Sequence, residues 1–103
     1  MTTAAAGPAP IHVEKLMSLS RAEFEKSVEA LGGEAVELGD GRAVIRMGEG
    51  RAEITFNALP AKRLGGLLLL PQARVVVDVS GLEEASAVEF LQRFDLAFQR
   101  GGG

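Results

Sequence analysis

Two cationic side chains followed by two glycines form the segment of this chain best suited to holding an anion, Lys62-Arg63-Leu64-Gly65-Gly66. Glycine lets successive backbone amides turn toward one point, and Lys62 and Arg63 add positive charge there. The glycine patterns of nucleotide-binding loops are absent from the chain. We therefore predict a solvated loop in which Lys62 and Arg63 contact a ligand or a partner.

A single carboxylate interrupts the valine-rich segment Arg74-Val75-Val76-Val77-Asp78-Val79. A partly buried Asp78 would have a raised pKa and would suit general acid catalysis. The simpler interpretation, which we favour, places Asp78 on the exposed face of a strand, paired with Arg74 or another arginine. If a small molecule binds between helix and sheet, Arg74 and Asp78 are its expected polar anchors.

Most side chains that carry catalysis or metal binding are missing. The chain has no Cys, no Tyr and no Trp, and its one histidine, His12, lies in the N-terminal segment. Thiol nucleophiles, disulfides and zinc–thiolate sites are therefore excluded. Asp40 and Glu49 are isolated carboxylates in glycine-rich turns, far short of the oxygen ligands that calcium needs. We predict no catalytic residue, no metal and no cofactor.

A second group of arginines alternates with other residues in short strand-like segments. Arg42, Arg46 and Arg51 are expected on one sheet face, which a partner or polar ligand can contact, together with Glu37, Glu53, Thr55 and Asn57. The whole chain has 11 Lys and Arg against 14 Asp and Glu, a net charge of −3. Nucleic-acid binding depends on an excess of positive charge, so we predict no nucleic-acid partner.

The elements that position these residues follow from periodicity. Ser20-Arg21-Ala22-Glu23 is a capping box that opens a helix over residues 20–31. Period-two segments at residues 34–38, 42–47 and 51–57 predict a meander. Pro60 predicts a short helical turn, and brief strands follow at residues 67–70 and 74–79, joined by a hairpin at 71–73. A second capping box, Ser80-Gly81-Leu82-Glu83, opens a final helix with an apolar stripe.

The predicted fold class is α+β, in the order α-β-β-β-(β)-β-α. An antiparallel meander of four to five strands carries an N-terminal and a C-terminal helix on one face. With 103 residues there is room for one domain, which we place at residues 17–103. Residues 1–16 are small or proline-rich and are expected to form a flexible tail. No export signal and no apolar run of membrane-spanning length is seen, so we expect a cytoplasmic protein without a membrane partner.

Leu67, Leu68, Leu69 and Leu70 form an apolar run. In a strand, one face of this run could pack on the core while the other face stays uncovered in the monomer. Exposed apolar strands are association sites, so a homodimer through these leucines is one expectation, and a strand covered on both sides is the other. We predict a non-catalytic binding or interaction module whose partner is a protein or a second copy. The alternative is a small-molecule or anion-binding protein, or an enzyme, with a site between helix and sheet.

The chain ends in Gly101-Gly102-Gly103, which resembles the diglycine ends of small sulfur-carrier and ubiquitin-like proteins. Those proteins extend the diglycine from a β-grasp fold, whose order of elements differs from the one expected here. The resemblance covers these last residues alone and implies a carrier whose activity is lost when Gly102 and Gly103 are deleted.

Overall fold

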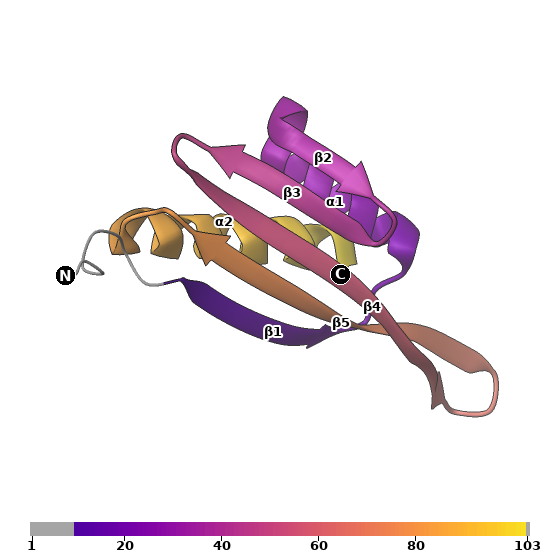
Figure 1. The fold of residues 1–103 in the computed structure, drawn as a ribbon. Coiled ribbons are helices and arrows are strands. Elements are labelled where there is room, and N and C mark those ends of the chain that lie inside the picture. The colour runs from indigo at the N-terminus through magenta and orange to yellow at the C-terminus, as the bar shows by residue number, and fades with distance from the viewer. Residues whose placement is uncertain (1–9, 103) are drawn as a thin grey trace.

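Residues 10–102 are described by a computed structural model of the chain, which contains five strands and two α-helices (Figure 1). Every neighbouring pair of strands is antiparallel, and the sheet order is β1-β5-β4-β3-β2. In chain order the elements are β1 (Ile11–Met17), α1 (Arg21–Gly32), a 3₁₀ turn (Gly33–Ala35), β2 (Val36–Gly39), β3 (Arg42–Met47), β4 (Gly50–Leu64), β5 (Leu68–Ser80) and α2 (Glu84–Gly102).

This architecture confirms the predicted α+β class, with one antiparallel sheet and two helices. Both helices lie behind the same face of the sheet in Figure 1. The capping box of α1 is present as expected: the backbone amide of Glu23 donates to the Ser20 hydroxyl at 3.2 Å, and the Ser20 amide donates to the Glu23 carboxylate at 2.8 Å. Two otherwise unpaired amides are thereby satisfied at the start of the helix.

The core lies between this helix side of the sheet and the two helices. Phe24 of α1 packs 5.2 Å from Phe56 of β4 and 6.0 Å from Phe98 of α2, measured between ring centroids. Phe94 stacks on Phe98 at 4.3 Å. The alternating inward residues of the central strands complete the core, namely Ala43, Ile45, Ala52, Ile54, Val75, Val77 and Val79. The helix side is therefore apolar and closed, and the opposite face is open to solvent.

Residues 11–16, which were expected to belong to a flexible tail, form most of strand β1. Ile11 pairs with Val79 and Met17 pairs with Ala73, so β1 is an edge strand along β5. Ile11 and Val13 pack against the core, whereas His12 and Glu14 are exposed. This alternation is that of a half-buried strand. Residues 1–9 of the expected tail lie outside the described residues.

The expected breaks at Pro60 and Pro71 are wrong: β4 continues to Leu64, and β5 runs without interruption from Leu68. Leu59 pairs with Gln72 and Lys62 with Leu70, so the register skips two residues of β4 and one of β5. Two residues opposite one is the definition of a β-bulge. Pro60 and Pro71 lie in this bulge, where no ladder hydrogen bond is required of them. The bulge thus replaces the expected helical turn and hairpin.

The final helix also starts later than expected, because Ser80 is the last residue of β5 and α2 begins at Glu84. The predicted second capping box at Ser80 is therefore wrong. Gly81 provides the sharp exit from the sheet with a φ of 77°. The expected apolar stripe is confirmed, since Ala87, Phe90, Phe94 and Phe98 are all buried.

Candidate functional site

Strands β4 and β5 extend beyond the rest of the sheet as a two-stranded arm, residues 58–72. Strand β1 ends opposite Ala73, and β3 ends opposite Thr55. Just beyond β3, the amide of Phe56 donates to the carbonyl of Gly41 in the β2–β3 turn at 2.8 Å. Past these points the two strands pair only with each other. The arm projects from one end of the sheet (Figure 1), and the molecule measures 59 × 27 × 23 Å.

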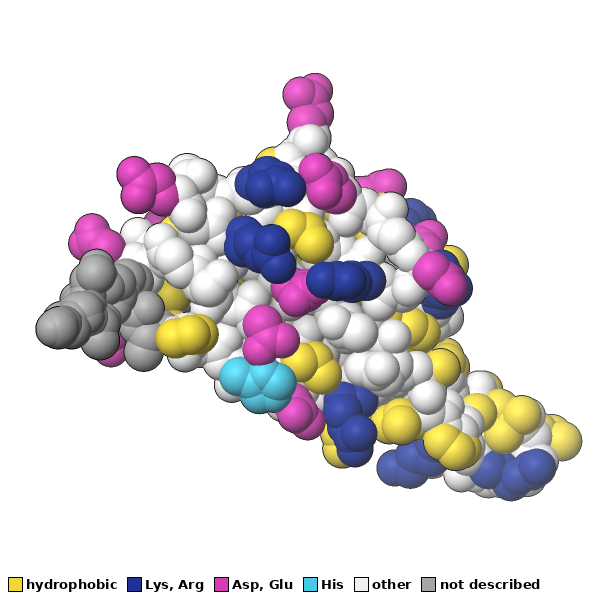
Figure 2. All heavy atoms as spheres, viewed as in Figure 1, with side chains coloured by type: hydrophobic (Ala, Val, Ile, Leu, Met, Phe, Trp, Pro, Cys, Tyr) yellow, Lys and Arg dark blue, Asp and Glu magenta, His cyan; other side chains and the backbone are white. Residues whose placement is uncertain are grey.

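Leucines cover the outer half of this arm. The exposed fraction is 99% for Leu67 in the turn, 55% for Leu69, 54% for Leu68 and 40% for Leu64. Figure 2 shows hydrophobic side chains gathered along the projecting arm. Leu64 pairs with Leu68 and Arg63 pairs with Leu69, so each pair shares one face of the hairpin. The arm thus exposes apolar side chains on both faces, which marks it as an association surface.

The charge of the arm differs from that of the rest of the chain. Lys62 and Arg63 lie on it, and no Asp or Glu occurs between Glu53 and Asp78. The whole chain nevertheless carries a net charge of −3. The arm is therefore both the basic and the most exposed apolar part of an otherwise acidic protein.

The segment expected as an anion-holding loop is a hairpin turn. Lys62 and Arg63 are the paired strand residues opposite Leu70 and Leu69. Gly65 adopts a φ of 60°, and the Arg63 guanidinium donates to the carbonyl of Gly66 at 3.4 Å. The two cations are held on a strand beside leucines, an arrangement suited to an amphipathic partner.

Arg42, Arg46 and Arg51 are exposed and alternate with the buried Ala43, Ile45 and Ala52, so they lie on the open face as expected. Figure 2 shows basic and acidic side chains interspersed on this face. Arg42 pairs with Glu53, and Arg46 lies 3.7 Å from Glu37. Arg51 is aligned with Arg46 in the sheet register. Because carboxylates of the same face neutralise Arg42 and Arg46, this surface offers no concentrated positive field.

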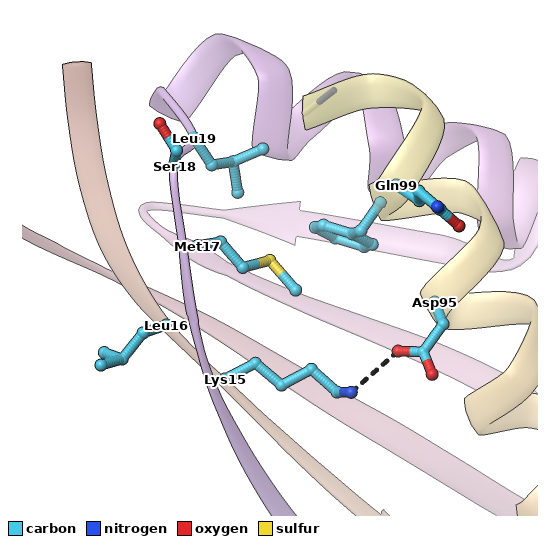
Figure 3. A pocket seen from close by; sticks show the side chains of 8 residues that line it. Lys15, Leu16, Met17, Ser18, Leu19, Asp95 and Gln99 are labelled. Atoms are coloured by element: carbon cyan, nitrogen blue, oxygen red, sulfur yellow. Dashed lines mark ion pairs between the residues drawn. The ribbon is translucent and has the colours of Figure 1, made fainter.

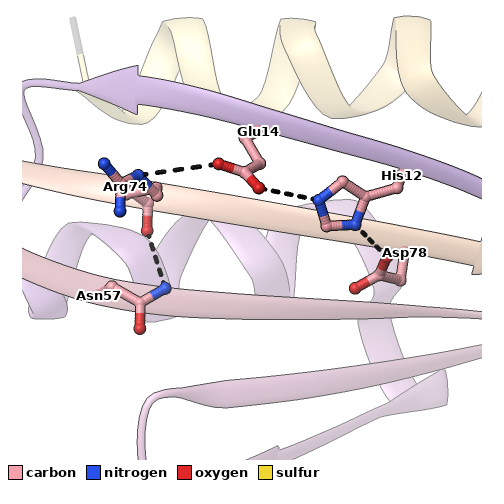
Figure 4. Close-up of polar contacts among 5 residues, drawn as sticks. All are labelled: His12, Glu14, Asn57, Arg74 and Asp78. Atoms are coloured by element: carbon pink, nitrogen blue, oxygen red, sulfur yellow. Dashed lines mark hydrogen bonds and ion pairs between the residues drawn. The ribbon is translucent and has the colours of Figure 1, made fainter.

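A chain of polar contacts crosses from β1 to β5 on the same face (Figure 4). The Nδ1 atom of His12 lies 2.5 Å from Asp78, and its Nε2 atom lies 2.9 Å from Glu14. The other Glu14 oxygen is 3.8 Å from Arg74. Both hydrogen bonds and the nearby charges raise the pKa of His12 above its ordinary value of 6.5, and the bond to Glu14 contributes most. A carboxylate can only accept, so this arrangement favours the doubly protonated imidazolium.

Arg74 and Asp78 therefore do not lie between helix and sheet, where they were expected as anchors of a small-molecule site. Successive strand residues alternate faces, and their neighbours Val75, Val77 and Val79 take the helix side. Sequence reasoning favoured an exposed Asp78 but missed its partner His12. The alternation of Ile11 and Val13 with His12 and Glu14 was the available signal.

The groove that does lie between helix and sheet is formed by β1 and α2 and has a volume of about 410 Å³. Figure 3 shows Lys15 reaching across it to Asp95, with the Nζ atom 2.9 Å from the carboxylate. Met17, Leu19 and Phe98 form its apolar lining. We call it the β1–α2 groove.

A second groove, of about 580 Å³, lies at the base of the arm, and we call it the base groove. Phe56, Ala58 and Pro71 contribute apolar surface, with the buried Leu19 beneath them. Arg21 and Asp40 line the groove as well, 2.7 Å apart. The carbonyl of Pro71 accepts from the amide of Leu19 at 3.1 Å and from the hydroxyl of Ser18 at 3.2 Å. These bonds fix the start of α1 against the arm and so hold the two walls of the groove together.

Within residues 10–102, no cluster of three or more His, Cys, Asp or Glu side chains is arranged to hold a metal ion. Neither helix in that range combines the length and the hydropathy of a membrane-spanning segment. Gly103, the last residue of the diglycine-type ending, lies outside the described residues. Comparisons of the chain with protein-family models, with curated proteins and with solved structures returned no match.

Proposed function

We propose that this protein is a non-catalytic interaction module that contacts its partner through the β4–β5 arm. The partner is a second copy of the chain. The observation that carries this proposal is the exposure of Leu64, Leu67, Leu68 and Leu69 on a projecting hairpin that contributes nothing to the core. We retain the cytoplasm as its compartment, since a chain without cysteine needs no oxidising environment.

Energetics support the arm as the contact element. Burying one fully exposed leucine is worth roughly 1.5–3 kcal/mol. Natural proteins normally shorten, charge or cover such strand edges, because exposed apolar edges associate. Here Lys62 and Arg63 are the charged residues of the exposed hairpin, and they leave the apolar tip uncovered. Burying the exposed leucines of the arm against a partner is therefore the most favourable contact that this surface offers.

The test is the mass of the protein in solution. Sedimentation equilibrium of the full chain should give a mass that rises with concentration from 10.8 kDa toward that of a dimer. The double variant Leu67→Ser/Leu69→Ser should stay at the monomer mass. A wild type that remains monomeric up to about 1 mM, where an association worth about 4 kcal/mol is half formed, refutes self-association.

The matched control removes the same number of exposed leucines elsewhere. Leu16 and Leu96 are exposed but lie on β1 and α2, outside the arm. The variant Leu16→Ser/Leu96→Ser should associate like the wild type. Equal loss of association in both double variants would mean that general surface hydrophobicity, not the arm, drives it.

A small-molecule role is the second candidate, and the β1–α2 groove favours it. Its apolar lining and the half-buried Lys15 suit a ligand that combines an apolar body with an anionic group. Anilinonaphthalene sulfonate is a suitable probe. Its fluorescence should rise with the wild type and fall when Lys15 is replaced by Met, whereas Lys26→Met on the exposed surface of α1 should change nothing.

A further inference from the structure

We infer that the arm of one copy docks in the base groove of a second copy, so that each chain supplies one arm and one groove to a twofold dimer. This inference rests on the proposed function and adds the identity of the receiving surface. It follows from three features of the molecule: the face on which the arm residues lie, the composition of the groove, and the position of the groove relative to the arm.

The helix side of the arm carries the docking residues. Along β5 the buried residues Val75 and Ala73 point to the helix side, and alternation places Pro71 and Leu69 on that side as well. Arg63 is the register partner of Leu69 and shares its face. Together with Leu67 at the tip, this face presents two exposed leucines and one cation.

The base groove complements that set. Phe56, Ala58 and Pro71 offer apolar surface there, above the buried Leu19. Asp40 lines the groove with its side chain 93% exposed, although it already contacts Arg21. The exposed leucines of one arm can therefore contact the apolar surface of the groove, while Arg63 contacts the carboxylate of Asp40. Opposite charge at the edge of an apolar contact fixes its register and suppresses other arrangements.

The arm projects away from the end of the sheet (Figure 1). Its base lines the groove, so its outer half, residues 62–70, cannot fold back to fill the groove of its own chain. A second copy can fill it. In a twofold contact each residue pair occurs twice, so the arm tip of one copy reaches the arm base of the other, and the reverse. The arm and the rest of the groove lining provide roughly 20 residues, the number on one side of a standard interface.

Disulfide trapping tests this arrangement, and the absence of native cysteine means that introduced thiols are the only ones present. The double variant Leu67→Cys/Ala58→Cys puts one thiol at the tip and one in the groove. Leu67 lies in the turn next to Leu68, which pairs with Leu64. Leu64 is six residues from Ala58 along β4, roughly 20 Å at about 3.3 Å per residue. A bridge within one chain is excluded, because disulfide Cα atoms lie within about 7 Å.

Under mild oxidation the double variant should form covalent dimers in high yield, and neither single variant should. Covalent dimers of Leu67→Cys alone would place tip against tip and overturn the groove assignment. A wild type that is dimeric by mass, with no trapping of the double variant, would also overturn it and leave self-association through the arm standing. A wild type that is monomeric and sediments with phosphatidylglycerol vesicles would refute both and assign the arm to an anionic lipid surface.

Discussion

The Nδ1 atom of His12 lies 2.5 Å from a carboxylate oxygen of Asp78, across the pairing of β1 with β5. The other ring nitrogen, Nε2, lies 2.9 Å from a carboxylate oxygen of Glu14. The edge strand is therefore held to the sheet by a charged side-chain contact in addition to its backbone ladder, and that contact depends on the protonation of one imidazole.

The contribution of His12 to stability should depend on pH. Its pKa is raised in the folded state, so the protonated ring stabilises the fold. This contribution is fully present below 6.5, the ordinary value, and is lost as pH rises through the folded pKa. Urea unfolding of the wild type and of His12→Gln should differ most below pH 6.5 and should converge as the pH rises through the raised pKa of the folded state. A difference that grows with pH would contradict the contact.

Removing the Phe94 ring should be among the most costly changes in the core. Phe94 is fully buried and stacks on Phe98 at 4.3 Å. Phe94→Ala should lower the free energy of unfolding by about 3–5 kcal/mol in urea titration. Leu96→Ala, two positions along the same helix but exposed, should change it by less than about 0.5 kcal/mol. Similar losses for both would mean that α2 does not pack as described.

Gly81 and Gly48 both adopt positive φ, 77° and 60°, but only Gly81 is crowded. A Cβ atom at Gly81 would lie 2.9 Å from the carbonyl oxygen of Glu49 and 2.9 Å from the Cα atom of Gly50, whereas one at Gly48 would meet nothing within 4 Å. Gly48→Ala should cost about 1–2 kcal/mol from backbone strain. Gly81→Ala should cost at least about 1 kcal/mol more in thermal unfolding. Equal costs would show that the exit from β5 can shift.

Leu68 and Leu69 form a matched pair for testing which face of the arm associates. Their exposed fractions are 54% and 55%, but their side chains lie on opposite faces. Leu69→Ser should weaken dimerisation about tenfold or more, since a twofold dimer buries this half-exposed leucine twice and each burial is worth at least about 0.8 kcal/mol. Leu68→Ser should weaken it much less. The opposite ranking in sedimentation equilibrium would place the partner on the other face.

Local sequence signals predicted much of the fold. The capping box that starts α1 is formed by Ser20 and Glu23, which lie within four residues of each other. It could therefore be recognised without knowledge of any distant contact. Likewise, the alternation around Ile45 and Ile54 reflects a sheet with one closed face, and the placement of Arg42, Arg46 and Arg51 on the other face follows from it.

The remaining features depend on contacts that no local pattern contains. Strand β1 is short, follows a proline-rich segment and becomes a strand by pairing with β5 near the other end of the chain. Pro60 and Pro71 ordinarily end strands, and only their position in one shared bulge allows the arm to continue. The partner of Asp78 could not be predicted for the same reason, because His12 reaches it only through the distant strand pairing.

The pairing of β1 with β5 also sets an order of assembly. His12 and Asp78 are 66 positions apart, so β1 gains its ladder only after a long loop has closed. On the ribosome, at about 5–20 residues per second, β1 waits several seconds for β5 to be synthesised. Of the five described strands, β1 precedes the others in the chain but cannot pair until β5 exists, and Ile11 and Val13 remain in water until then.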